Sequence, residues 1–210
     1  PPLAARFFAY SCLAAYEVVA LNDPAFISLK GKLNEFPEIK RPAVTAEINK
    51  DIAALLAVYE TAKVLQPSGK LMREFEQKWI DSLLNKGVSE EIMKQSLDFA
   101  KTVSVQILKY AKADRYNKIS ALPRYTPRNV DGTWYPTPPG YFPPVEPHFN
   151  TIRSFTLETS DQFKPEPPIP FSADKKAPFY TLMAEMKNLS LSQEQKEIAA
   201  FWDCNPFALF

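Results

Sequence analysis

The sequence predicts an all-α protein, a helical bundle with a long non-helical strap that is rich in proline and aromatic residues. Apolar residues recur at helical three- and four-residue steps at both ends of the chain, whereas 12 of the 20 prolines lie between Pro123 and Pro170. No segment shows the alternation of a strand. We therefore expect a bundle region at 1–122, an ordered strap at 123–177, and closing helices of the same domain at 178–210.

Composition excludes several classes of partner and site. With 25 Lys+Arg against 24 Asp+Glu, the net charge of +1 gives no electrostatic case for nucleic acid or an anionic membrane. The single histidine excludes, within this chain, any site that needs two imidazoles. Cys12 and Cys204 form neither a disulfide framework nor a CxxC metal site, and whether they pair or stay free thiols is open.

The first helix covers residues 3–21, an apolar run that Arg6 and Glu17 interrupt. At 100° per residue these charges lie within about 20° of each other, which predicts a narrow polar stripe on an otherwise buried helix. The run is short of the roughly 20 uninterrupted apolar residues of a membrane span. A membrane anchor is the alternative, and we expect no span.

Two further helices follow, one from Ala43 or Thr45 to Leu65 and one between Ser68 and Gly87. Pro67 stops the first, Ser68 caps the second and Gly87 ends it. The apolar face of the first is predicted at Ile48, Ile52, Leu55, Tyr59 and Ala62, and that of the second at Leu71, Phe75, Trp79 and Leu83.

The fourth helix starts at Ser89, because Glu90 and Glu91 then lie at the positive end of the helix dipole. Its apolar face is predicted at Ile92, Phe99, Val103, Ile107 and Tyr110.

Proline content alone leaves the strap equally compatible with a disordered linker. Disordered segments, however, are poor in large apolar side chains, which this segment has in number. We therefore expect the rings to pack down on the bundle, and consider a ligand for a proline-binding domain the less favoured alternative. The aromatic residues concerned are Tyr125, Trp134, Tyr135, Tyr141, Phe142, Phe149, Phe155 and Phe163.

Two short helices close the chain. Pro178 opens one that runs from Phe179 to about Lys187. Ser192 and Gln195 have the spacing of a capping box, which predicts the start of the other.

No self-sufficient active site is present, so no catalytic residue and no metal ligand is predicted in this chain. Cys12 lies in the apolar first helix, where a thiol behaves as a small hydrophobe. The remaining candidates are Glu146, His148 and Arg153, which lie within eight residues of each other among prolines. They form either a structural cluster, with Glu146 pairing to Arg153 or the imidazole, or part of the wall of a polar cavity.

Three segments resemble the vanadium-dependent haloperoxidase family, which belongs with the type 2 phosphatidic acid phosphatases in one helical superfamily. They are Trp-Tyr-Pro-Thr-Pro-Pro at 134–139, Val-Glu-Pro-His-Phe-Asn at 145–150 with its continuation to Phe155, and Ser-Asp-Gln-Phe at 160–163. Residues 191–202 and the first helix also match, so the resemblance covers nearly the whole chain.

The resemblance implies a helical enzyme in which basic side chains hold vanadate, or the phosphate that vanadate mimics. The family's motifs for this cradle are Lys-x6-Arg-Pro, Pro-Ser-Gly-His and Ser-Arg-x5-His, and none occurs in this sequence. In the family they lie beyond the position of Phe210, so no family catalytic residue can be carried over.

We therefore interpret the chain as the amino-terminal, helical portion of a haloperoxidase-like or acid phosphatase-like enzyme, inactive alone and partnered by a missing carboxy-terminal half. A non-catalytic binding module that uses the strap is the alternative. Resemblance alone favours a bacterial periplasm or cell envelope, and homo-oligomerisation stays open.

Overall fold

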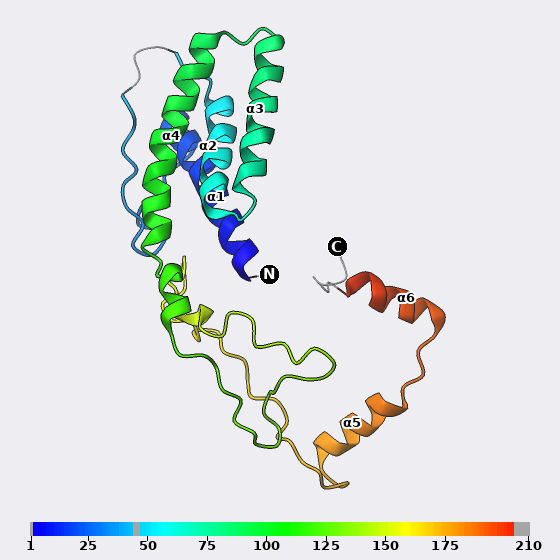
Figure 1. Ribbon diagram of the computed structural model, residues 1–210. Helices are drawn as coiled ribbons and strands as arrows, with labels where there is room; N and C mark the ends of the chain where they lie inside the picture. The colour runs from blue at the N-terminus through cyan, green and yellow to red at the C-terminus, as the bar shows by residue number, and fades with distance from the viewer. Residues whose placement is uncertain (1, 44–46, 204–210) are drawn as a thin grey trace. The chain divides into compact units, whose positions relative to one another are not determined.

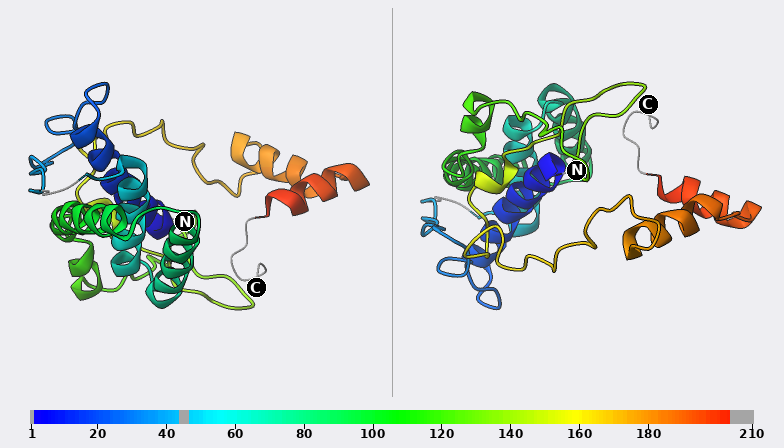
Figure 2. Two further views of the ribbon diagram at one scale, coloured as in Figure 1. Left: turned by 90° about the horizontal axis from the view of Figure 1, so that it is seen from above. Right: turned by 90° about the horizontal axis from the view of Figure 1, so that it is seen from below.

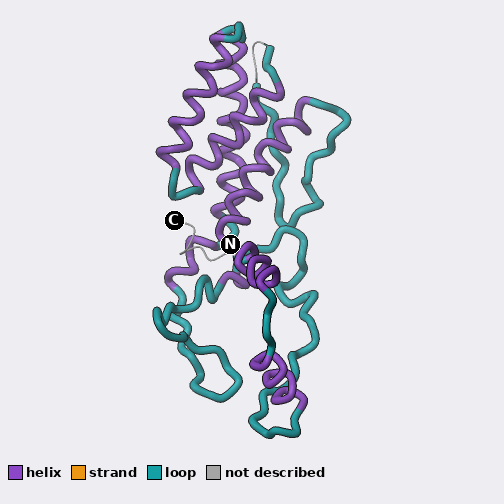
Figure 3. The backbone as a smooth tube through the Cα atoms, turned by 90° about the vertical axis from the view of Figure 1, so that its right-hand side faces the viewer, coloured by secondary structure: helices purple, strands orange, loops and turns teal. Residues whose placement is uncertain are grey.

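The computed structural model describes residues 2–43 and 47–203. The predicted helix start at Thr45, and also Cys204 and Phe210, lie outside these residues. The chain divides into two compact units, one formed by residues 1–125 and 144–163 and the other by residues 126–143 and 164–210. The described residues contain helices and loops and no strand (Figure 3), as the all-α prediction requires.

The first unit is a bundle of four helices, α1 (Pro2–Asn22), α2 (Lys50–Leu65), α3 (Gly69–Asn85) and α4 (Glu90–Lys112). In Figure 1, α2, α3 and α4 lie alongside one another. The view from below in Figure 2 shows α1 running obliquely across them. Helix α2 packs against the other three helices, and α1 also packs against α4. The apolar core therefore lies where α1, α2 and α4 meet.

Side-chain caps set two of the helix starts. Ser89 Oγ accepts a hydrogen bond from Ile92 N at the start of α4, as predicted. Helix α2 begins at Lys50, later than predicted, because Asn49 Oδ1 accepts hydrogen bonds from the backbone amides of Asp51 and Ile52 and so acts as the N-cap. Ser68 occupies the N-cap position of α3 but makes no capping hydrogen bond through its side chain.

Burial agrees with the predicted face in α4 and differs in the two helices before it. Phe99, Val103, Ile107 and Tyr110 of α4 are buried. In α2, Ile52 and Ala62 are buried as predicted, but the buried face is shifted in the middle of the helix, so that Leu56 is fully buried whereas Leu55 is 38% exposed. In α3 the predicted face is only partly covered, because Leu71 and Phe75 remain about half exposed, and the most buried side chain is that of Glu76.

Helix α1 buries its predicted polar stripe together with apolar core residues, Tyr10, Leu13, Ala14 and Val18. Arg6 and Glu17 are buried, at 8% and 0% exposed, while Phe8 is exposed. The polar stripe therefore faces the bundle, because it has partners there: Arg6 pairs with Asp114, and Glu17 Oε1 accepts a hydrogen bond from Leu29 N. Helix α1 is long and apolar enough to cross a membrane, but core helices of soluble proteins can be equally long and apolar.

Part of the predicted strap, residues 144–163, packs on the bundle. Asn34 N donates to the carbonyl of Phe155 at 2.7 Å, and its side-chain amide donates to the carbonyls of Ser154 and Leu157. The Phe155 ring is partly buried against the core and lies 5.2 Å from the ring of Tyr10. This part of the strap is ordered by long-range contacts rather than by regular structure, apart from the single 3-10 turn η2 (Phe149–Thr151).

The second unit contains α5 (Pro178–Asn188), α6 (Gln193–Trp202) and the two remaining parts of the strap. The predicted capping box is present: Gln195 N donates to Ser192 Oγ, and Ser192 N donates to Gln195 Oε1. Neither helix has a buried residue. Within this unit Trp134, Tyr135, Tyr141 and Phe142 are about half exposed or more, so the unit itself does not bury them. In the first unit, the expectation that the strap's rings pack down is wrong for Tyr125 and Phe163, which are 41% and 78% exposed.

Candidate functional site

A buried ion pair joins the first helix to the end of the fourth. Helix α4 ends at Lys112, and the turn that follows brings Asp114 into the bundle, where it is 1% exposed. Arg6 Nε donates to Asp114 Oδ2 at 2.7 Å, and its Nη2 donates to Asp114 Oδ1 and to the carbonyl of Ala111. Such a two-pronged pair fixes orientation as well as distance, so α1 is held in register with α4.

Two tyrosines complete the surroundings of this ion pair. Tyr10 Oη donates to Asp114 Oδ2, and burial together with the nearby Asp114 carboxylate raises the pKa of the Tyr10 hydroxyl above its ordinary value. Tyr116, in the 3-10 helix η1 (Tyr116–Ala121), stacks beneath the Arg6 guanidinium at 4.6 Å. Burial, with Glu146 accepting its hydrogen bond, raises the pKa of Tyr116 to about 12. Both phenols are therefore hydrogen-bond donors at neutral pH.

Arg153 connects this network to residues 144–163. Its backbone amide donates to the carbonyl of Asp114 at 3.0 Å, and its Nη2 donates to the carbonyl of Tyr110 at 2.9 Å and to Tyr10 Oη at 3.3 Å. The guanidinium lies 3.7 Å from the centre of the Tyr110 ring, and Nη1 is 3.6 Å from Glu35 Oε2. Arg153 Nε is buried with no hydrogen-bond partner.

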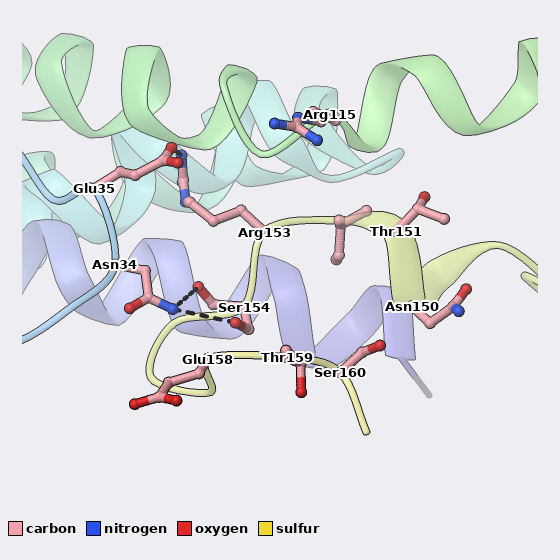
Figure 4. Close-up of a pocket in the computed structure, with 11 residues that line it drawn as sticks. Asn34, Glu35, Arg115, Asn150, Thr151, Arg153, Ser154, Glu158, Thr159 and Ser160 are labelled. Atoms are coloured by element: carbon pink, nitrogen blue, oxygen red, sulfur yellow. Dashed lines mark hydrogen bonds and ion pairs between the residues drawn. The ribbon is translucent and has the colours of Figure 1, made fainter. Parts of the chain in front are cut away.

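A polar pocket of about 480 Å³ opens beside Arg153 (Figure 4). Its wall comes from the loop at Asn34 and Glu35, from Arg115 after α4, and from residues 150–154 and 158–160. Arg115, in the turn after α4, has a left-handed φ of 73° and is the N-cap residue of η1. The lining combines two guanidinium groups with two carboxylates, those of Glu35 and Glu158, and with the hydroxyls of Thr151, Ser154, Thr159 and Ser160.

Of the three residues singled out from the sequence, Arg153 alone belongs to this lining. Glu146 accepts a hydrogen bond from Tyr116 at 2.8 Å, so its recorded partner is neither Arg153 nor the imidazole. His148 Nε2 lies 2.7 Å from the carbonyl of Pro123. These contacts fix Glu146 and His148 to the end of the bundle and to the start of the strap.

The pocket can bind polar groups, but its residues do not make a vanadate cradle. A tetrahedral oxyanion needs converging cationic or N–H donors, whereas the terminal nitrogens of Arg153 are already occupied and two carboxylates share the pocket. Its hydroxyls have no imidazole or thiol beside them among the lining residues. Across residues 2–43 and 47–203, no three His, Cys, Asp or Glu side chains converge in a way that could hold a metal ion.

The sequence left Asp114 and Asn34 unnoticed. A usable signal did exist, because a charged residue such as Arg6 inside an apolar helix requires a buried partner of opposite charge. Its identity could not be found from spacing, since Asp114 lies 108 residues away.

Comparison with solved structures shows an extensive similarity. No protein-family model and no curated protein matches the chain. The crystal structure of a bacterial vanadium-dependent iodoperoxidase matches 99% of this chain, with a TM-score of 0.86 and 33% sequence identity. The chain spans about half, 52%, of that protein's length. The resemblance predicted from the sequence is thereby confirmed: the chain has the fold of about half of a vanadium-dependent haloperoxidase.

Proposed function

We propose that this chain is the amino-terminal helical portion of a vanadium haloperoxidase-like enzyme, and that it forms the scaffold beside which a second portion supplies the oxyanion-binding residues. The observation that carries the proposal is the match of 99% of the chain to 52% of an iodoperoxidase at 33% identity. The vanadate cofactor belongs in this proposal to the complete enzyme.

Two features of the chain support a division of labour between the portions. The described residues offer a polar pocket without a vanadate cradle, so the cradle has to come from elsewhere. Helices α5 and α6 have apolar side chains and no buried residue, as expected of elements that a second portion covers. The proposed place of action is a bacterial periplasm or cell envelope.

The reaction is tested on the protein produced from its complete coding sequence. With vanadate and hydrogen peroxide it is expected to oxidise iodide or bromide, whereas residues 1–210 alone are expected to be inactive under the same conditions. A generic phosphate ester, assayed in parallel, tests the related phosphatase chemistry. A coding sequence that stops after Phe210, or a complete protein inactive in both assays, would refute the proposal.

We keep the proposal that His148 and Arg153, with Glu146, line the anion cavity of the complete enzyme. His148→Ala and Arg153→Ala, each made in the complete protein, are then expected to lower turnover or vanadate affinity, because a positive or hydrogen-bonding wall is lost. Steady-state kinetics and vanadate titration measure this. Unchanged kinetics with a lower melting temperature would leave these residues a structural role only.

A binding module is the second candidate, and the exposure of Trp134 and Tyr141 favours it. An enzyme portion complete in itself would bury these rings, whereas a module that binds a protein or glycan would present them. Burial of both rings in the complete protein, measured by hydroxyl-radical footprinting, would exclude this alternative.

A further inference from the structure

Helix α1 has an outward apolar face that the described residues of the first unit leave exposed. Phe8 is 67% exposed and Cys12 is also exposed, and the two lie one helical turn apart, on the same side as the partly exposed Tyr16. The buried side of α1 carries the core residues Tyr10, Leu13, Ala14 and Val18 together with Arg6 and Glu17. A helix that is apolar on its outward face as well as on its core side is typical of an element covered on both sides.

A groove lies along this face. It has a volume of about 310 Å³ and is lined by Ala9, Cys12, Tyr16, Leu29, Leu33 and Phe155, among others, with no charged residue in the lining. Because the groove combines α1, the loop after it and residue 155, it is shaped by the whole unit rather than by one helix. Its chemistry fits an apolar side chain and offers no counter-charge to a charged partner.

Resting on the function proposed above, we propose that this groove, together with Phe8, is the docking face for an apolar helix or loop from the second portion of the same polypeptide. The solved iodoperoxidase that contains 99% of this chain has nearly as many residues again, which gives the face an occupant of the required size. In the complete protein α1 would then be buried on both sides.

A lipid surface fits less well than a protein segment. To span a bilayer, α1 would have to leave the bundle and break the Arg6–Asp114 pair and the hydrogen bond between Leu29 N and Glu17. To lie on a bilayer, an amphipathic helix needs its polar face in water, and the polar face of α1 is buried.

Cys12 gives a direct readout of whether the face is covered. In a Cys204→Ser background, iodoacetamide is expected to alkylate Cys12 at least tenfold more slowly in the complete protein than in residues 1–210. Phe8→Gln in the complete protein is expected to restore most of the fast rate. Val105→Gln is the matched control, since Val105 on α4 is similarly exposed, at 64%, and should leave the protection intact.

Each other outcome assigns the face differently. Fast alkylation in the complete protein, or a coding sequence that ends at Phe210, would overturn the proposal. Protection already present in residues 1–210 would also overturn it, because the chain's own residues would then cover the face. Protection of residues 1–210 by phosphatidylcholine–phosphatidylglycerol vesicles would overturn it in favour of a membrane. Fast alkylation in a protein that oxidises iodide would refute the docking face alone, whereas a protected Cys12 in an inactive protein would refute only the proposed reaction.

Discussion

Asp114→Ala is expected to lower the free energy of unfolding by about 3–5 kcal/mol, the cost typical of removing one partner from a buried ion pair. The substitution leaves the Arg6 guanidinium buried at 8% exposure without its carboxylate, and it also removes the acceptor of Tyr10 Oη and of Tyr116 N. Urea denaturation followed by circular dichroism measures the loss. Since Arg6 and Asp114 join α1 to α4, the whole bundle should unfold at lower urea.

Glu38→Ala is the matched control for this variant. Glu38 also pairs with a cation, Lys30, but both side chains are more than half exposed, so water replaces the lost partner and the urea midpoint should not move. Asp114→Asn keeps the size and part of the hydrogen bonding and should fall between the wild type and Asp114→Ala. A loss below about 1 kcal/mol for Asp114→Ala would mean that Arg6 finds water or another partner, and that the pair does not organise the bundle.

The helices that the sequence predicts correctly are those marked by local signals. Ser89 and the capping box of Ser192 and Gln195 act within one turn, so their effect can be predicted without tertiary structure. The late start of α2 has the same origin, because Asn49 is a local cap that outweighs the helical pattern before it. The start of this helix is therefore marked in the sequence by its cap residue and not by apolar periodicity.

What depends on residues distant in the chain was not predictable. The polarity of α1 is set by Asp114 and by the loop at Leu29, and neither is visible in the helix itself. The order of residues 144–163 depends on two residues distant in the chain. Asn34 donates hydrogen bonds to the carbonyls of Phe155 and Leu157, more than 100 positions later, and the carbonyl of Asp114 accepts one from Arg153 N, about 40 positions later. The resemblance to a family identified the fold, because it rests on segments from nearly the whole chain and not on one element alone.

In the candidate site, too, contacts between residues distant in the chain were not predictable from the local sequence. A cluster of Glu146, His148 and Arg153 was predicted from nearness in sequence, yet their recorded partners are Tyr116, Pro123 and Tyr110, three residues of α4 and the segment after it. Nearness along the chain therefore did not predict the contacts of these three side chains. Arg153 reaches the pocket because Tyr10 and Tyr110 hold its guanidinium there.

The shifted face of α2 yields the second large effect. Leu56→Ala is expected to lower the free energy of unfolding by about 2–5 kcal/mol, because Leu56 is fully buried where α1, α2 and α4 meet, and the cavity left by its side chain can close only in part. Leu55→Ala, at the neighbouring position that the sequence pattern places in the core, should cost less than about 1 kcal/mol.

The two leucine variants form a matched pair, because they change the same side chain in the same helix and so carry the same change in helix propensity. Their difference in urea denaturation therefore reports burial alone. Ile52 and Ala62 of the predicted face are buried as expected, so a larger loss for Leu55→Ala than for Leu56→Ala would place Leu55 in the core with them. The observed face instead follows from α2 having neighbours on several sides, α1 and α4 as well as α3, which a single apolar stripe cannot describe.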